Sequence, residues 1–202
     1  MAIEIVREYL KKWDAQDRIL EFPVSSATVE LAAQAVGCEP ARIAKTLSFL
    51  VPDAANDKES AAQGNLEAQG GEEEVPPRFA QRQVAPPISM RCAQGGAHAV
   101  LIVAAGDAKV DNSKYKQYFH TKAKMLHGEQ VTELIGHAIG GVCPFGVKDG
   151  VEIFLDVSLK RFDTVFPAAG SSNSAIEVTM EELERFSGSS TWIDVCKGWQ
   201  EE

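Results

Sequence analysis

Two stretches decide the fold: ARIAKTLSFLV at residues 41–51 and AHAVLIVAA at residues 97–105. Apolar runs of this length that are rich in branched side chains predict strands buried in a sheet. We therefore expect residues 45–51 and 97–105 to be partner strands. The rest of the chain is read outward from this pair.

Helical patterns lie on both sides of the pair. The first residues predict an amphipathic helix whose apolar face holds Ile5, Val6, Tyr9, Leu10 and Trp13. Residues 26–37 predict a helix capped by Ser26 and ended by Gly37, and Pro40 starts a further helical turn. Further helices are expected at residues 111–119, capped by Asp111 or Ser113, at 128–136, and at 179–188, where Thr179 and Glu182 form a capping box.

Strand-like segments follow at residues 18–23, 122–126, 151–159, 164–170 and 174–179. The order mixes hairpins with helices, which indicates an α+β (mixed α/β) fold with a central mixed sheet flanked by helices. The 202 residues are enough to bury a core without disulfides or metals, and we expect a single domain over residues 1–202.

An acidic insertion separates the two deciding strands. Residues 53–74 hold seven acidic side chains against one lysine, and four prolines follow by residue 87. A stretch this poor in large apolar side chains cannot offset its ordering entropy, so we expect residues 53–94 to be largely disordered. A partner-docking role and a tolerated surface insertion both fit this composition.

Charge and cysteine use narrow the class of protein. The net charge of −9 argues against nonspecific binding to DNA or RNA, yet residues 53–74 alone carry a net charge of −6. Residues 109–124 instead carry five lysines against one aspartate. The four cysteines form no CxxC pair and no membrane-length apolar run is present, so we expect a reduced, cytoplasmic protein without metal, cofactor or membrane contact.

The most informative loop is GGVCPFG at residues 140–146. Glycines let a backbone approach a ligand closely and turn its N–H groups toward a carbonyl oxygen or an oxyanion. A purely structural turn between a helix and a strand also fits this loop. Lys45, at the start of its strand, is a candidate anchor for a phosphate or a carboxylate, and a solvated lysine is the alternative.

Taken together, these segments resemble the YbaK-type aminoacyl-tRNA deacylases, relatives of the editing domain of bacterial prolyl-tRNA synthetase. IAKTL, LIVAAGDAKVD, GHAIGGVCPFG and FLDVSL occur in the family's order over residues 15–187. The resemblance implies hydrolysis of the ester of a mischarged tRNA, usually tRNA-Pro, with prolyl-tRNA synthetase as a candidate partner.

The resemblance also implies roles for individual residues. Lys45 matches the family's essential lysine, which contacts the 3′ end of the tRNA, and Gly140 and Pro144 delimit a GxxxP motif that holds the aminoacyl carbonyl and the terminal ribose. Water attacks with the help of backbone contacts and a ribose hydroxyl of the substrate. The other substrate-binding candidates are Thr46, His137, Gly141, Val142, Cys143, Gly146, Ser174 and Ala175.

Alternatives stay open at three places. Some members that edit Cys-tRNA-Pro carry an aspartate where this chain has Ala175, which argues against cysteine as the amino acid removed. Cys143 is a candidate nucleophile for a small-molecule ester, although no histidine is placed by motif to activate it. A binding module without catalysis is the main rival to an enzyme.

The lysine-rich segment supplies the candidate tRNA contacts Lys109, Lys114 and Lys116. An ordinary solvated helix face is the alternative. If these lysines contact phosphates, tRNA binding is salt-sensitive and weakens when Lys114 and Lys116 are neutralised.

Overall fold

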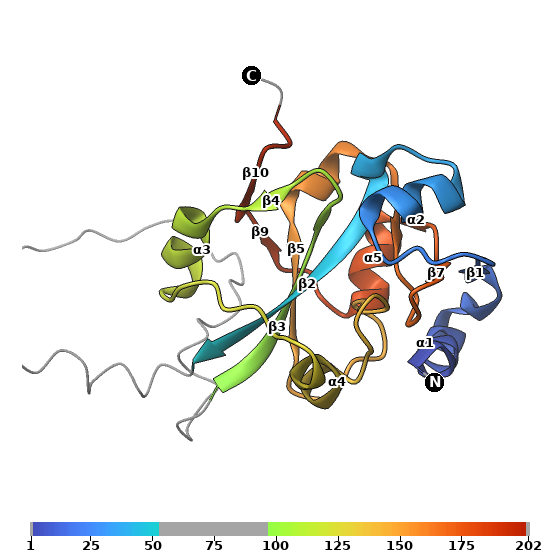
Figure 1. Cartoon of the computed structure of the whole chain (residues 1–202), viewed down its shortest axis with the longest axis horizontal. Coiled ribbons are helices and arrows are strands. Elements are labelled where there is room, and N and C mark those ends of the chain that lie inside the picture. Colours follow the sequence, from blue (N-terminus) through green and yellow to red (C-terminus); the bar gives the residue numbers. More distant parts are fainter. Residues whose placement is uncertain (1, 53–96, 201–202) are drawn as a thin grey trace, which may run out of the picture. The chain divides into compact units, whose positions relative to one another are not determined.

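The computed structural model describes residues 2–52 and 97–200, and the expected insertion at 53–94 lies outside them. Its main feature is a six-stranded sheet in the order β8-β6-β2-β3-β5-β9. The strands are β2 (Ile43–Pro52), β3 (Ala97–Ala105), β5 (Glu152–Asp156), β6 (Thr164–Pro167), β8 (Val178–Thr179) and β9 (Trp192–Ile193). The two deciding stretches are therefore neighbours at the centre of the sheet, as predicted (Figure 1).

The sheet is mixed. Pairs β2–β6, β3–β5 and β5–β9 are parallel, whereas β6–β8 is antiparallel. Strand β3 is the centre of the core, because residues 100–105 have no solvent exposure. A strand covered on both faces needs a continuous apolar run, which is the pattern that the sequence has there.

Two short antiparallel ladders lie outside this sheet. β1 (Leu20–Glu21) pairs with β7 (Ser174–Ala175), and β4 (Lys109–Val110) pairs with β10 (Cys196–Lys197). The C-terminal segment thus supplies both β9 and β10. Through β10 it lies against the residues that follow β3 (Figure 1).

The helices flank the sheet, and the mixed α/β class with a central mixed sheet is confirmed. They are α1 (Ala2–Leu10), α2 (Val29–Val36), α3 (Asn112–Phe119), α4 (Glu129–Ile135) and α5 (Met180–Ser187). Asp111 caps α3 by accepting from the Ser113 and Lys114 amides. Thr179 and Glu182 form the predicted capping box of α5.

Two helical details differ from the prediction. Thr28, not Ser26, caps α2: its hydroxyl accepts from the Leu31 amide at 3.3 Å, whereas Ser26 is bonded to the Ser172 carbonyl across the fold. On α1 the buried residues are Ile3, Val6 and Leu10, while Ile5 is 52% exposed. Both differences come from tertiary packing, which a local pattern does not contain.

The five strand predictions outside the central pair were too long or wrong, and those at 18–23 and 164–170 shorten to β1 and β6. Residues 122–126 form no strand, and only Met125 makes an isolated bridge, to Phe49. The strand expected at 151–159 ends at Asp156, which caps the 3-10 helix η5 (Val157–Arg161). Residues 174–179 divide into β7 and β8, which pair with different strands.

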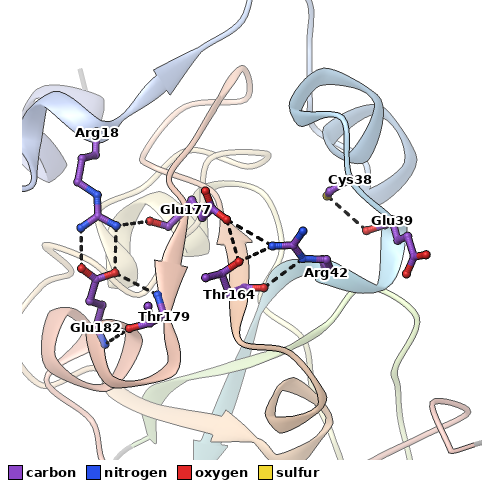
Figure 2. A network of polar contacts seen from close by, with 8 residues as sticks. All are labelled: Arg18, Cys38, Glu39, Arg42, Thr164, Glu177, Thr179 and Glu182. Carbon is purple, nitrogen blue, oxygen red and sulfur yellow. Dashed lines mark hydrogen bonds and ion pairs between the residues drawn. The ribbon is translucent and has the colours of Figure 1, made fainter.

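A polar network ties the N-terminal arm to the sheet (Figure 2). Arg18, in the 3-10 helix η2 (Gln16–Arg18), pairs with Glu182 of α5 at 2.6 Å. Arg42, in η3 (Pro40–Arg42), binds Glu177 and the Thr164 backbone, each at 3.3 Å. The Arg42 contacts therefore fix the start of β2, and with it the backbone that carries Lys45, whereas the Arg18 pair joins η2 to α5.

Candidate functional site

Lys45 extends from β2 to the turn that joins β3 to β4. Its Nζ donates to the Gly106 carbonyl at 3.0 Å and also to the Ala108 carbonyl. Burial lowers the pKa of the half-buried Lys45 ammonium below its usual value. An ammonium has three N–H donors, so two carbonyl bonds leave one donor for a ligand.

The turn at residues 106–108 is closely packed against η3. A Cβ on Gly106 would lie 2.0 Å from the Pro40 carbonyl oxygen and 2.7 Å from the Val29 side chain. The Gly106 amide also donates to the Ala41 carbonyl at 3.3 Å. Only glycine fits this position, and its close approach sets the two carbonyls that receive Lys45.

The glycine loop packs against the segment after β6. Gly140 has φ +86°, and a Cβ there would lie 3.1 Å from the Ser172 Cβ. A Cβ on Gly141 would lie 2.7 Å from backbone atoms of Gly170 and Ser171. Gly141 is therefore required by contact between two backbones, and Gly140 by its positive φ and its close packing against Ser172 and Ala27. The approach to a ligand that the sequence pattern suggested for these glycines stays a prediction.

Not every amide of the loop is available to a ligand. The Gly141 amide donates to the Ala138 carbonyl at 3.0 Å, and the Cys143 amide donates to His137 Nδ1 at 3.3 Å. Within the described residues no hydrogen bond is made by the amides of Gly140 and Val142. The amides of Phe145 and Gly146 are also not bonded to another backbone group among these residues, but Phe145 is fully buried and Gly146 packs against α1. The Gly140 and Val142 N–H groups are therefore the loop's candidate donors to a carbonyl oxygen or an oxyanion.

The segment opposite the loop is held by its own serines. The Ser171 hydroxyl donates to Asn173 Oδ1 at 2.9 Å, and its oxygen lies at hydrogen-bond distance, 2.8 Å, from the Ser174 hydroxyl. Asn173 in turn binds Phe22 on the N-terminal arm at 2.9 Å. Ser174 and Ala175 are 2% and 3% exposed, so both small side chains are buried beside this segment.

The parallel pairing of β2 with β6 brings Lys45 and the segment that packs against the glycine loop to the same end of the sheet. Ala44 is opposite Pro167, so the chain that leaves β6 toward Gly170 starts beside Lys45. Gly170 then contacts Gly141. Lys45, the glycine loop and Ser174 are thus linked through one connection. The sequence pattern gave no reason to single out this connection, although AAGSSNS has the small residues of a tight turn.

His137 and Cys143 form a buried pair that the sequence pattern did not reveal. Cys143 Sγ lies 3.5 Å from His137 Nδ1, and both residues have no exposure. Burial raises the pKa of the Cys143 thiol to about 12, so the thiolate is absent at neutral pH. Neither a nucleophilic role for Cys143 nor direct substrate contact by either residue is supported by this geometry.

The remaining candidates take different positions. Thr46 is half-buried, and its hydroxyl has no hydrogen-bond partner among the described residues. Val142 packs against the core cluster that contains Val131 and Ile135. Pro144 is buried, and a Cβ on Gly146, whose φ is +61°, would lie 3.3 Å from side chains of α1. Val142 and Gly146 therefore anchor the loop from behind.

The three predicted tRNA lysines are not equivalent. Lys114 pairs with Asp194 at 2.7 Å and donates to the Cys196 carbonyl at 3.2 Å. Lys109 and Lys116 are exposed, and neither pairs with a carboxylate in residues 2–52 or 97–200. Lys197, which the sequence pattern missed, lies opposite Lys109 in the β4–β10 ladder.

Other features of the described residues do not coincide with this site. A shallow hollow along α1 is lined by Glu4, Ile5, Glu8, Tyr9, Lys11 and Lys12. No cluster of three or more potential metal ligands occurs among the described residues. Within the same part of the chain, no helix has the length and apolar character needed to cross a membrane.

Comparison with known proteins identifies the class. The sequence pattern described as "Aminoacyl-tRNA editing domain" matches residues 73–186, more than half of the chain. The chain therefore belongs to the aminoacyl-tRNA editing-domain family. The matched span contains the glycine loop and Ser174, and it begins after Lys45. A Bacillus subtilis (strain 168) relative, "Uncharacterized protein YwhH", is 44% identical over 200 residues, which cover 99% of this chain and 100% of the relative.

Solved structures share the fold at lower identity. One is the "Crystal structure of a putative trans-editing enzyme for prolyl tRNA synthetase", with 24% identity, a TM-score of 0.68 and coverage of 98% of both chains. Another, "hypothetical protein APE2540", has 21% identity and a TM-score of 0.64, covering 96% of this chain and 99% of that one. These likenesses establish the fold that the resemblance implied.

The buried histidine gives a pH prediction for stability. Burial lowers the pKa of His137, so the unfolded chain binds a proton more readily than the folded protein does. The free energy of unfolding is therefore expected to fall as pH drops below about 6.5, the unfolded value. Urea unfolding between pH 8 and pH 5 measures this loss.

The His137→Asn variant is the matched control, because an amide oxygen can accept from the Cys143 amide without titrating. It is expected to show a shallower loss of stability over the same pH range. An identical pH dependence in both proteins would contradict the assignment of this loss to His137.

Proposed function

We propose that this protein is a trans-editing aminoacyl-tRNA deacylase. It hydrolyses the ester between a wrongly attached amino acid and the 3′ end of a tRNA in the cytoplasm, with tRNA-Pro as the first candidate. The observation that carries the proposal is the half-buried Lys45 ammonium, fixed by two carbonyls and linked through β6 to the glycine loop. Membership of the editing-domain family supports the same substrate class.

The site favours catalysis by position and by hydrogen bonding. The remaining N–H of Lys45 binds the acceptor end of the tRNA, and the Gly140 and Val142 amides face the aminoacyl carbonyl, where negative charge develops during attack. Water is the nucleophile, helped by a ribose hydroxyl of the substrate. The fully buried Cys143 thiol, with its raised pKa, takes no part in bond making.

Ser174 and Ala175 border the space for the amino acid. Both are small, and Ala175 stands where some members that remove cysteine have an aspartate. A wall of this kind admits a small side chain and offers it no carboxylate partner. Prolyl-tRNA synthetase is the candidate partner from which the mischarged tRNA is released.

A deacylation panel tests the proposal. The purified chain is incubated with Ala-, Cys-, Ser- and Thr-charged tRNA, including tRNA-Pro, and release of the amino acid is followed against the spontaneous rate. Faster release from at least one mischarged tRNA is expected. Binding without turnover on every member would reject the enzyme and favour a binding module.

The exposed lysines carry a separate prediction for tRNA affinity. Because Lys114 already pairs with Asp194, neutralising Lys109 and Lys116 is expected to have the larger electrostatic effect per charge removed. The slope of log K against log salt for tRNA binding should become shallower by about 1 to 2 in the double alanine variant. Filter binding between 50 and 200 mM salt measures it.

Lys160→Ala is the control, because this exposed lysine is in η5 and lies over the Trp192 ring instead. It should leave the salt slope unchanged. An equal slope in the wild type and in the Lys109/Lys116 variant would show that these lysines make no phosphate contact.

A further inference from the structure

The turn that holds Lys45 is itself held by Arg161, the last residue of η5. Asp107 lies between Gly106 and Ala108, the two residues whose carbonyls bind Lys45. Its carboxylate accepts from Arg161 Nη2 at 2.6 Å. The ion pair therefore acts on the residue at the centre of the turn.

All three nitrogens of the Arg161 guanidinium are engaged. Besides Asp107, Nε donates to the Ser158 carbonyl at 2.9 Å and Nη1 to the Trp199 carbonyl at 3.0 Å. The guanidinium also lies over the Trp199 ring, 5.3 Å from its centroid. Because all three nitrogens are bonded, the planar guanidinium has one orientation and holds the Asp107 carboxylate in one position.

The same elements fix both ends of the turn. Before it, the Ala105 amide donates to the Ser158 hydroxyl at 3.1 Å. After it, the Asp111 amide donates to the Val195 carbonyl at 2.8 Å. The buried Asp156 carboxylate joins the two, accepting from the Ser158 and Val195 amides, each at 3.0 Å. Through Asp156, the start of η5 and the C-terminal segment are thus joined, and together they hold the turn.

We propose that Arg161 is a positioning residue for Lys45, acting through Asp107 and anchored by the C-terminal segment at Trp199. The inference rests on the proposed function, because Lys45 is the residue that binds the acceptor end. The physical reason is that the Lys45 side chain is flexible, so the position of its ammonium depends on the positions of its two carbonyl acceptors. An error of about 1 Å in such a contact can cost about 100-fold in rate.

The Arg161→Met variant tests the proposal, because methionine keeps part of the side-chain volume and removes every donor. Two readouts are measured: the single-turnover deacylation rate at saturating protein, and the pH titration of the Lys45 13Cε resonance in lysine-labelled protein. Lys45→Met assigns that resonance. Asp107→Asn is a second, milder variant in case Arg161→Met does not fold.

Arg18→Met is the matched control. Arg18 makes an ion pair of the same length, 2.6 Å, with Glu182 in the separate network of Figure 2. It should leave both readouts unchanged. Loosening the turn should lower the saturating rate about tenfold or more, with the half-saturating concentration within about twofold. The Lys45 titration should move toward the ordinary lysine value as its Nζ becomes hydrated.

The outcomes are distinct. A lower rate with an unchanged Lys45 titration, or a moved titration with an unchanged rate, overturns the positioning role. Unchanged readouts in both the Arg161 and the Asp107 variants overturn it as well. If the wild type deacylates no tRNA, the proposed function fails; a moved titration then still shows that Arg161 holds Lys45.

Discussion

Replacing Lys45 with methionine is expected to lower the deacylation rate by about 100-fold or more, the range found when one preorganised donor is removed from a catalytic site. Methionine keeps the apolar stem and removes the charge together with all three N–H donors. The Gly106 and Ala108 carbonyls lose their hydrogen-bond donor. The acceptor end of the tRNA loses the ammonium that binds it. The single-turnover rate on the preferred mischarged tRNA measures the effect.

Lys12→Met is the matched control for this prediction. Lys12 is an exposed lysine that lies over the Tyr9 ring, and it donates to neither of the carbonyls that bind Lys45. Its removal should change the rate by less than about twofold. Thermal unfolding of both variants separates a loss of chemistry from a loss of fold. Full activity in a folded Lys45→Met protein would remove Lys45 from the mechanism.

A methyl group at Gly141 is expected to have the second-largest effect. The added Cβ would lie 2.7 Å from the Gly170 carbonyl carbon and from the Ser171 backbone. Backbone cannot rotate away as a side-chain end can, so one segment has to move. Overpacking of this kind costs about 1–3 kcal/mol of stability. We expect Gly141→Ala to lose that much and to lose most deacylation, because the displaced loop carries the Gly140 and Val142 amides.

Two other glycines separate strain from loop displacement. Gly140 and Gly150 have nearly the same backbone angle, φ +86° and +87°, so alanine is strained equally at both. A Cβ on Gly140 would meet Ser172 at 3.1 Å, whereas nothing lies within 4 Å at Gly150. Gly140→Ala should therefore lose more activity than Gly150→Ala. Urea unfolding and single-turnover rates on the three variants check this order; equal losses at all three glycines would argue against a packed catalytic loop.

The N-terminal arm shows why local patterns are only partly informative. The period of its apolar residues predicted α1 correctly, and Val6 and Leu10 are buried as expected. Ile5 is exposed and Ile3 is buried, because the face of a helix that becomes covered depends on what packs against it. The same reason moved the cap of α2 from Ser26, which is bonded to Ser172 146 residues away, to Thr28.

By itself, the sequence determined the elements whose causes are local. The apolar run of β3, the Asp111 cap and the Thr179–Glu182 capping box all depend on residues within a few positions of one another. The glycine loop was visible as a motif, but its packing against Gly170 and Ser171 was not. These elements, with the motif spacing, were enough for the fold class and the family. Local hydrogen bonds and periodicity are fixed by neighbours in the chain, so they can be read from it.

Only the tertiary structure decided what the site residues touch. Lys45 and its acceptor Gly106 are 61 positions apart, Arg161 and Asp107 are 54 apart, and Lys114 and Asp194 are 80 apart. The structure also made Cys143 and His137 a buried pair. A side-chain contact between distant residues depends on strand register and on the packing of whole elements. Neither of these can be predicted from the spacing of residues along the chain.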